Sequence, residues 1–298
     1  MMSEFPAAAE SPKHDADPEE WLAWSASLDE MIVSGFGARA PSDEHIAQTQ
    51  FELNGVTTYV FTPNSVAQAA STPLCIDVHG GGLITGSGAA CVALTKLNAL
   101  ERNMLTWAPD YRMPPIHPYP AALDDLIAVY RKALDERDPV DILVSGGSAG
   151  GNLAAALLLR AKDEGLPIPK ALMLLTPEVD LTESGDSFQT NMGIDQVLGS
   201  LMEANLLYAN GHDLTHPYIS PLFGDHRGFP PTYLQTGTRD LFLSNTVLMH
   251  RRLRKAGIEA ELHIGEAMSH GGFGGTSPED LELAEEQARF IKRHFPSL

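Results

Sequence analysis

One serine stands between glycines in a setting that would make its hydroxyl a nucleophile. Ser148 is the centre of Gly146-Gly-Ser-Ala-Gly150, which follows the apolar run 142–144 and precedes a helix-forming stretch, 152–160. A strand, a glycine-flanked serine and a helix form a nucleophile elbow, whose tight turn presents the serine at the carboxyl edge of a sheet. The amide of Ala149 then points to where an oxyanion would form. Taken alone, the pentapeptide is also compatible with an ordinary Gly/Ser-rich turn.

A second glycine-rich stretch, His79-Gly-Gly-Gly82, follows an expected buried strand at 73–78. Consecutive glycines leave their backbone amides uncovered, so an anion can approach them closely. Upstream of a serine elbow, such a loop supplies the other half of an oxyanion hole. The alternative, a phosphate-binding loop, is disfavoured because no Gly-Lys-Ser/Thr follows and the glycine spacing does not fit a dinucleotide fingerprint.

A serine hydroxyl is a weak nucleophile and needs an imidazole that is itself held by a carboxylate. In a sheet with a serine elbow these partners follow the serine, the acid first, each on a loop after a late strand. Asp240, after the expected strand 232–236, is the candidate acid, and His270, after the expected strand 259–264, is the candidate base. Asp240 could instead serve only as a cap for the next helix. The weaker candidates for base and acid are His226, Asp225 and Glu266.

Strand and helix patterns alternate around these residues. Asn54-Gly55 between two strand patterns predicts a hairpin. The repeated strand–helix units predict an α/β fold with a mostly parallel central sheet and helices on both faces. Further strands are expected at 51–53, 57–61, 103–108, 142–144 and 171–175, and further helices at 89–99, 119–130, 244–256 and 278–294.

Two regions fall outside this alternation. Residues 1–45 contain an amphipathic helix that begins near Pro18, and we interpret them as N-terminal cap helices. From about 180 to 221 the alternation breaks, although a helix-like pattern covers 192–208, and we interpret this segment as a cap insertion in an α/β core of 46–298. Aromatic and methionine side chains near the expected cap suit either an apolar pocket or lid packing: Trp21, Trp24, Met192, Met202 and Tyr208.

The composition excludes several classes of partner. The 298 residues include 20 Lys and Arg against 39 Asp and Glu, a net charge of −19, which disfavours nucleic acid and anionic membrane surfaces. The two cysteines, Cys75 and Cys91, show no metal spacing and make no disulfide framework. No secretory signal and no apolar run of membrane-spanning length is evident, so we expect a cytoplasmic protein without stable membrane insertion.

Together these stretches resemble the hormone-sensitive-lipase-like family of α/β-hydrolase carboxylesterases, over roughly 73–295. The resemblance implies Ser148, Asp240 and His270 as the catalytic triad and a cap built from the N-terminus and the insertion. It also implies the amides of Gly81, Gly82 and Ala149 as the oxyanion hole, with His79 as loop support. A homodimer through the late strand–helix elements is a family expectation. Besides the two glycine motifs, the marks are Asp110-Tyr-Arg-Met-Pro-Pro-Ile-His-Pro-Tyr-Pro-Ala-Ala122, Asp180-Leu-Thr182, Gly237-Thr-Arg-Asp240 and His270-Gly271.

Three positions depart from the family pattern. Gly147 stands where an acidic residue is common, and Leu83 stands where an aromatic residue often follows the third glycine. Pro114-Pro115-Ile116 replaces the usual Ala-Pro-Glu, so a loop carboxylate is missing. None of these departures removes a catalytic group, but they leave the subfamily and the substrate open.

The predicted function is a serine carboxylic-ester hydrolase that acts on small to medium uncharged esters through an acyl-enzyme, without a cofactor or a metal. A lactone hydrolase would use the same machinery with a differently shaped pocket. An amidase fits less well, because nothing marks protonation of an amine leaving group. From a different class, a catalytically inactive small-molecule receptor would typically have lost the histidine, and His270 in its expected context argues against it.

Overall fold

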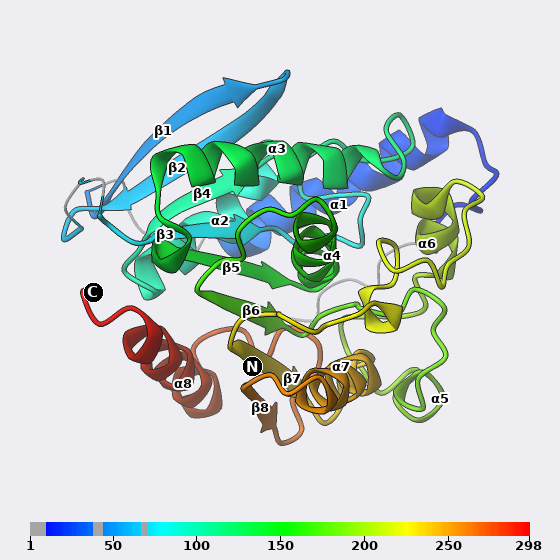
Figure 1. Cartoon of the computed structure of the whole chain (residues 1–298). Helices are drawn as coiled ribbons and strands as arrows, with labels where there is room; N and C mark the ends of the chain where they lie inside the picture. Colours follow the sequence, from blue (N-terminus) through cyan, green and yellow to red (C-terminus); the bar gives the residue numbers. More distant parts are fainter. Residues whose placement is uncertain (1–9, 38–43, 67–68, 70) are drawn as a thin grey trace.

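The sheet at the centre of the molecule has eight strands in the order β1-β2-β4-β3-β5-β6-β7-β8 (Figure 1). The computed structural model describes residues 10–37, 44–66, 69 and 71–298. β1 and β2 pair antiparallel, as do β2 and β4, and every pair from β4 to β8 is parallel. This arrangement confirms the predicted α/β-hydrolase sheet. The strands are β1 Ile46–Leu53, β2 Val56–Pro63, β3 Leu74–Val78, β4 Leu105–Pro109, β5 Ile142–Gly147, β6 Ala171–Leu175, β7 Thr232–Gly237 and β8 Ala260–Gly265.

The predicted hairpin joins β1 to β2 at the sheet edge. Its two turn residues, Asn54 and Gly55, have φ values of 53° and 81°. Positive φ at both central residues is what a type I′ turn requires, and Asn-Gly is the pair that adopts it most readily. The strands extend beyond the patterns seen in the sequence because the register pairs Ile46 with Pro63.

Helices cover both faces of the sheet, and alternate residues of each strand face them. Ile76 and Val144 point to the face covered by α3, α4 and α7, whereas their neighbours Cys75 and Leu143 belong to the cluster under α8. α2 covers the same side as α8, next to β4 and the hairpin. Burial on both faces explains why the central strands are apolar throughout. The helices of the core are α2 Ala89–Glu101, α3 Ala121–Glu136, α4 Ala149–Asp163, α7 Leu243–Lys255 and α8 Pro278–His294, with 3-10 turns at Pro139–Asp141 and Pro221–Phe223.

The insertion after β6 contains less helix than the pattern at 192–208 predicts. The structure has only α5 Ser187–Thr190 and α6 Met202–Ala209, and the segment 192–201 is not helical, so that part of the prediction is wrong. Gly193 has a φ of 74°. The carboxylate of Asp195 accepts the amides of Val197 and Leu198, which competes with helical hydrogen bonding. Side-chain capping of a turn therefore overrides the apolar periodicity here.

The N-terminal helix, α1 Pro18–Gly37, lies at the same end of the molecule as α6 (Figure 1). Asp17 caps it by accepting the amide of Glu19. Trp21 is fully buried and clusters with Ile84 of the glycine loop and Ala204 of α6. Of the expected N-terminal cap, 1–9 and 38–43 lie outside the described residues. Within the described chain, no helix combines the length and the apolar character needed to cross a membrane.

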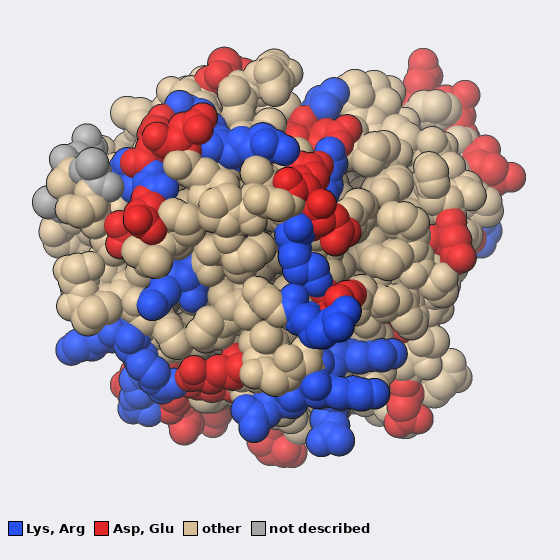
Figure 2. Space-filling view, in the orientation of Figure 1, with Lys and Arg blue, Asp and Glu red and all other residues tan. Residues whose placement is uncertain are grey.

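Charge is distributed unevenly over this acidic chain. Figure 2 shows Lys and Arg gathered on the lower part of one face, where α7 lies in Figure 1. The last turn of α7 contributes Arg252, Arg254 and Lys255, where positive charge complements the helix dipole. The net charge of −19 is therefore not a uniform surface property.

Candidate active site

The turn between β5 and α4 holds Ser148 in a backbone conformation that side chains rarely adopt. Its φ is 56° and its ψ is −126°, a strain of about 1–3 kcal/mol for a residue with a Cβ. A Cβ on Gly146 would lie 2.2 Å from the carbonyl oxygen of Gly150, and one on Gly150 would lie 2.0 Å from that of Val78. Only glycine fits these two positions, so the Gly-x-Ser-x-Gly pattern is a steric requirement of this turn.

The glycine loop after β3 lies directly against the nucleophile turn. A Cβ on Gly80 would lie 3.2 Å from the Cβ of Ser148. Gly81 has a φ of 124°, and a Cβ there would lie 2.1 Å from the carbonyl oxygen of Thr85. Within the described part of the chain, no backbone carbonyl accepts a hydrogen bond from the amides of Gly81, Gly82 or Ala149. These amides are thus uncommitted to secondary structure.

His79 anchors the start of this loop. Its Nδ1 lies 2.7 Å from the carbonyl oxygen of Gly80, and its ring stacks on Tyr111 with 4.1 Å between centroids. The hydroxyl of Tyr111 donates to the carbonyl oxygen of His79 over 2.8 Å. Burial lowers the pKa of His79 to about 4, so the imidazole is neutral near pH 7. These contacts fit the predicted supporting role.

The N-terminal helix also braces the glycine loop. Asp29 of α1 accepts the amide of Gly86 over 2.6 Å and the hydroxyl of Thr85 through the same oxygen, Oδ1. Both donors lie a few residues past Gly82, so a residue far away in sequence fixes the loop from outside. No sequence pattern predicts this contact, because Asp29 resembles any acidic residue on the polar side of an amphipathic helix.

Asp240 and His270 meet at the carboxyl ends of β7 and β8. The Nδ1 atom of His270 lies 3.1 Å from Oδ1 of Asp240, whose residue is fully buried. Asp240 also accepts the hydroxyl of Thr236 and the amide of Phe242, each over 2.8 Å. The capping interaction considered as an alternative is therefore present, but it coexists with the histidine contact.

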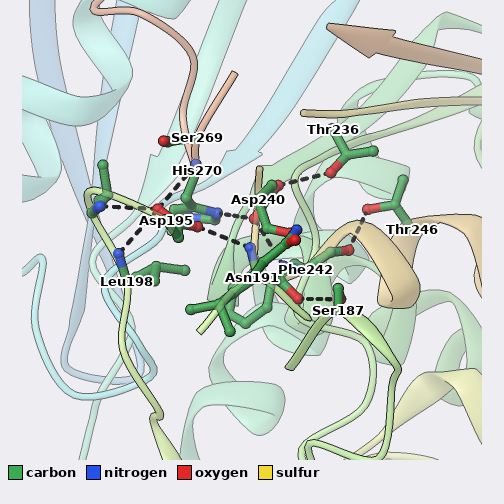
Figure 3. A network of polar contacts seen from close by, with 12 residues as sticks. Ser187, Asn191, Asp195, Leu198, Thr236, Asp240, Phe242, Thr246, Ser269 and His270 are labelled. Atoms are coloured by element: carbon green, nitrogen blue, oxygen red, sulfur yellow. Dashed lines mark hydrogen bonds and ion pairs between the residues drawn. The ribbon is translucent and has the colours of Figure 1, made fainter. Parts of the chain in front are cut away.

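Two residues of the insertion hold the loops that carry this pair (Figure 3). Asp195 accepts the amide of Leu241 over 2.8 Å and the amide of His270 over 3.4 Å. The side-chain amide of Asn191 donates to the carbonyl oxygen of Asp240 over 2.9 Å. Both residues were missed in the sequence, since they lie in an irregular segment and act on loops about 50 to 75 positions away.

The weaker candidates lie elsewhere. Nε2 of His226 is 2.9 Å from the carbonyl oxygen of Pro221, and its ring packs against Phe229. Asp225 forms an ion pair with Arg227, and Glu266 is exposed.

The topology brings the predicted nucleophile, acid and base to one edge of the sheet. β5, β6, β7 and β8 are consecutive parallel neighbours, so their carboxyl ends lie on the same side. Ser148 directly follows β5, Asp240 follows β7 and His270 follows β8. This edge is where open α/β sheets bind their ligands.

Comparison with known proteins agrees with this architecture. A family model described as the α/β hydrolase fold matches residues 75–273. A curated protein named esterase, from Acinetobacter venetianus, is 33% identical over 230 residues, covering 75% of this chain and 76% of that protein. The crystal structure of an esterase E25 has a TM-score of 0.87 and 37% identity, covering 94% of this chain and 87% of that one. The crystal structure of an esterase from the bacterial hormone-sensitive lipase family has a TM-score of 0.82 and 28% identity, covering 97% and 94%.

With the sheet order, the glycine-flanked serine and these matches in hand, the class of protein is defined: the chain belongs to the α/β-hydrolase family. Within that family it is one of the hormone-sensitive-lipase-like esterases.

Proposed function

We propose that this esterase hydrolyses carboxylic esters with Ser148 as nucleophile, His270 as general base and Asp240 as the carboxylate that orients the histidine. One observation carries the proposal. Asp240 and His270, which form a hydrogen bond of 3.1 Å, follow two parallel strands. They lie at the same sheet edge as the strained serine turn.

The hydrogen bond also defines the chemistry expected of the histidine. When Nδ1 donates its proton to the carboxylate of Asp240, Nε2 keeps a lone pair. Nε2 then takes the proton of Ser148 as the serine oxygen attacks the ester carbonyl, and returns it to the leaving alcohol as the acyl-enzyme forms. In the second half of the reaction, Nε2 takes a proton from water as the water oxygen attacks the acyl-enzyme, and returns it to the Ser148 oxygen as the carboxylic acid leaves. The full burial of Asp240 strengthens its interaction with the imidazolium that forms transiently.

The amides of Gly81, Gly82 and Ala149 are proposed to bind the oxyanion of the tetrahedral intermediate. They are free of backbone acceptors in the described chain, and the glycine loop packs against the Cβ of Ser148. Preorganised donors of this kind each lower the barrier by about 3 kcal/mol.

Small to medium uncharged esters are the proposed substrates. Phe242 lies edge-on to the ring of His270 with 5.0 Å between centroids, which places an apolar surface beside the proposed base. Exposed apolar side chains also flank Asp195 in the insertion: Met192, Ile194 and Val197. An apolar acyl or alcohol group would bury such surfaces favourably.

We propose that 1–45 and 180–221 act together as a cap. The Trp21 cluster joins α1 to α6, and Glu203 of α6 accepts the amide of His14 over 2.8 Å and the ammonium of Lys13 over 3.1 Å. A cytoplasmic location and a homodimer through β8 and α8 complete the proposal. The edge position of β8 leaves one side of this strand available for pairing with a second copy. Sedimentation of the purified protein in an analytical ultracentrifuge tests the dimer.

The decisive experiment compares Ser148→Ala with the unmodified protein on a p-nitrophenyl short-acyl ester. We expect turnover to fall by about 10⁴-fold or more. A covalent fluorophosphonate probe should label the unmodified protein and leave the variant unlabelled. Full turnover by the variant would overturn the mechanism, and lack of labelling of the unmodified protein would favour an inactive receptor. Parallel kinetics on a lactone and a linear ester separate the two hydrolase alternatives.

A further inference from the structure

Three side chains with different donor atoms converge behind the glycine loop. His79 follows β3, Cys91 lies in the first turns of α2, and Asp110 follows β4. One ring nitrogen, the Sγ atom and one carboxylate oxygen of these residues all lie within 4.8 Å of one another. Imidazole, thiolate and carboxylate are the ligand types that zinc and related borderline metal ions prefer. Their spacing along the chain, 12 and 19 residues, resembles no zinc motif, so the sequence could not reveal the cluster.

The histidine has a donor position without a partner. Nδ1 of His79 is engaged with the carbonyl oxygen of Gly80 at 2.7 Å, so that nitrogen carries the proton and Nε2 holds a lone pair. Nε2 is buried and has no hydrogen-bond partner in the described chain, and the whole residue is only 2% exposed. An unsatisfied buried acceptor is costly and calls for an explanation in a native structure.

The second proposed ligand is the thiol of Cys91. The Sγ atom of Cys91 has a weak contact of 4.0 Å to the carbonyl oxygen of Pro109 and a hydrogen-bond contact with the side chain of Thr95, and the residue is fully buried. Cys75, the other cysteine, is equally buried but lies 3.8 Å from the guanidinium of Arg102. The two thiols therefore have different surroundings, and only that of Cys91 faces a histidine and a carboxylate.

A cavity of about 480 Å³ between α1 and the 110–117 loop reaches one of the three side chains, Asp110. Asp110 lines it together with Asp29, and apolar side chains such as Leu22 and Ile84 form other parts of the wall. Two carboxylates in one cavity attract cations. The Gly88 amide donates to both carboxylate oxygens of Asp110, at 3.1 and 3.0 Å, and each oxygen keeps a second lone pair for a metal ion.

We propose that a borderline divalent cation of the zinc class binds here, held by His79, the thiolate of Cys91 and Asp110, with its fourth position open to the cavity. On binding, the thiol of Cys91 releases its proton to water and its sulfur forms a bond to the metal. Metal–ligand bonds of about 2.0–2.3 Å would fix the separations of the three donor atoms, which lie within 4.8 Å of one another.

Fixing these ligands acts on the oxyanion loop. His79 is bonded to Gly80 through its ring, and Asp110 is bonded to Gly88 through its carboxylate, so movement of either ligand shifts the glycine segment between them. Displaced amides no longer match an oxyanion. The metal ion is therefore an inhibitor of the esterase, binding outside the substrate site.

Cadmium titration of the full-length protein tests the site through a readout independent of activity. A bound thiolate gives a ligand-to-metal charge-transfer absorption, which should saturate at one equivalent. Cys75→Ala is the matched control and should bind like the unmodified protein, whereas Cys91→Ala should lose the absorption and bind at least about tenfold more weakly. Absence of the absorption in the unmodified protein, or its persistence in Cys91→Ala, overturns the proposal.

A second variant keeps the test informative if Cys91→Ala fails to fold. Asp110→Asn retains an acceptor for the Gly88 amide and removes a charged ligand, so zinc affinity measured by equilibrium dialysis should fall by at least about tenfold. Zinc inhibition of ester hydrolysis, expressed relative to the zinc-free rate of each protein, should weaken by the same factor. Unchanged zinc affinity in Asp110→Asn overturns the site, and zinc binding without inhibition overturns its inhibitory role.

Discussion

The two sides of the proposed active site are held by different kinds of interaction. On the nucleophile side, Ser148 is fixed by backbone packing so close that a Cβ on Gly146 or Gly150 would overlap a carbonyl oxygen. On the base side, Asp240 and His270 sit on loops held by hydrogen bonds from the side chains of Asn191 and Asp195. The first side is built from neighbours in sequence and from β3, whereas the second depends on a distant insertion.

The difference predicts opposite sensitivities. Backbone packing cannot relax, because protein interiors have few voids and transmit strain, so added volume on the nucleophile side should disrupt the fold. Side-chain hydrogen bonds can be removed with modest loss of stability, so changes on the base side should alter turnover much more than unfolding.

Gly150→Ala should have the largest effect. Its Cβ would lie 2.0 Å from the carbonyl oxygen of Val78, so we expect a loss of at least about 3 kcal/mol of unfolding free energy and no measurable turnover. Urea denaturation and ester hydrolysis measure both. Gly199→Ala is the control, because nothing lies within 4 Å of its added Cβ. If Gly150→Ala were as stable as the unmodified protein, the idea that close backbone packing fixes the nucleophile side would be wrong.

Asp240→Asn should lower turnover by about 10⁴-fold, because an amide favours the wrong histidine tautomer while preserving the shape of the site. The unfolding free energy should change far less than in Gly150→Ala. The side-chain oxygen of asparagine can still accept the backbone N–H of Phe242, which donates to Asp240 over 2.8 Å in the unmodified protein. Initial rates and urea midpoints measured on one preparation give the ratio of the two effects. A loss of stability as large as that of Gly150→Ala would mean that the base side is structural as well.

Asp195→Asn should lower kcat by about 10–100-fold with a smaller change in KM, because small misplacements of catalytic groups are costly. The lost charge weakens the hold on the amides of Leu241 and His270. Asp213→Asn is the matched control: Asp213 is an insertion carboxylate that also accepts an amide, that of Thr215, but lies at the surface. Equal kinetics in the two variants would show that Asp195 of the insertion does not position the base side of the site.

The smallest expected effect concerns Glu178, whose amide donates to the carbonyl oxygen of Ser148 over 3.1 Å. Burial raises its pKa from 4.5 to about 8. Between these values the folded state binds a proton that the unfolded state has released, so stability should fall as pH rises from about 5 to 8. Glu178→Gln should flatten this dependence, as measured by Tm at several pH values. An unchanged slope in the variant would show that other groups cause it.

The sequence predicted the parts of the molecule whose structure depends on local rules. The hairpin follows from Asn54-Gly55, the last helix begins and ends as predicted at 278 and 294, and the serine turn follows from its glycines. The helix-like pattern predicted at 192–208 was wrong over 192–201, because the Asp195 side chain accepts amides that a helix would use. Asn191 and Asp195 were not found, because hydrogen bonds between distant loops leave no periodic trace along the chain.

The contact between Asp29 and the glycine loop has a consequence for how the enzyme tolerates trimming. The helix that carries this carboxylate lies outside the eight-stranded sheet, so a protein shortened past residue 37 keeps every strand. It loses, however, the acceptor for the Gly86 amide and the Thr85 hydroxyl. Proteolytic removal of this helix would thus lower catalysis even in molecules whose sheet is still folded, and detecting a folded core alone would be a poor guide to how much working enzyme a sample contains.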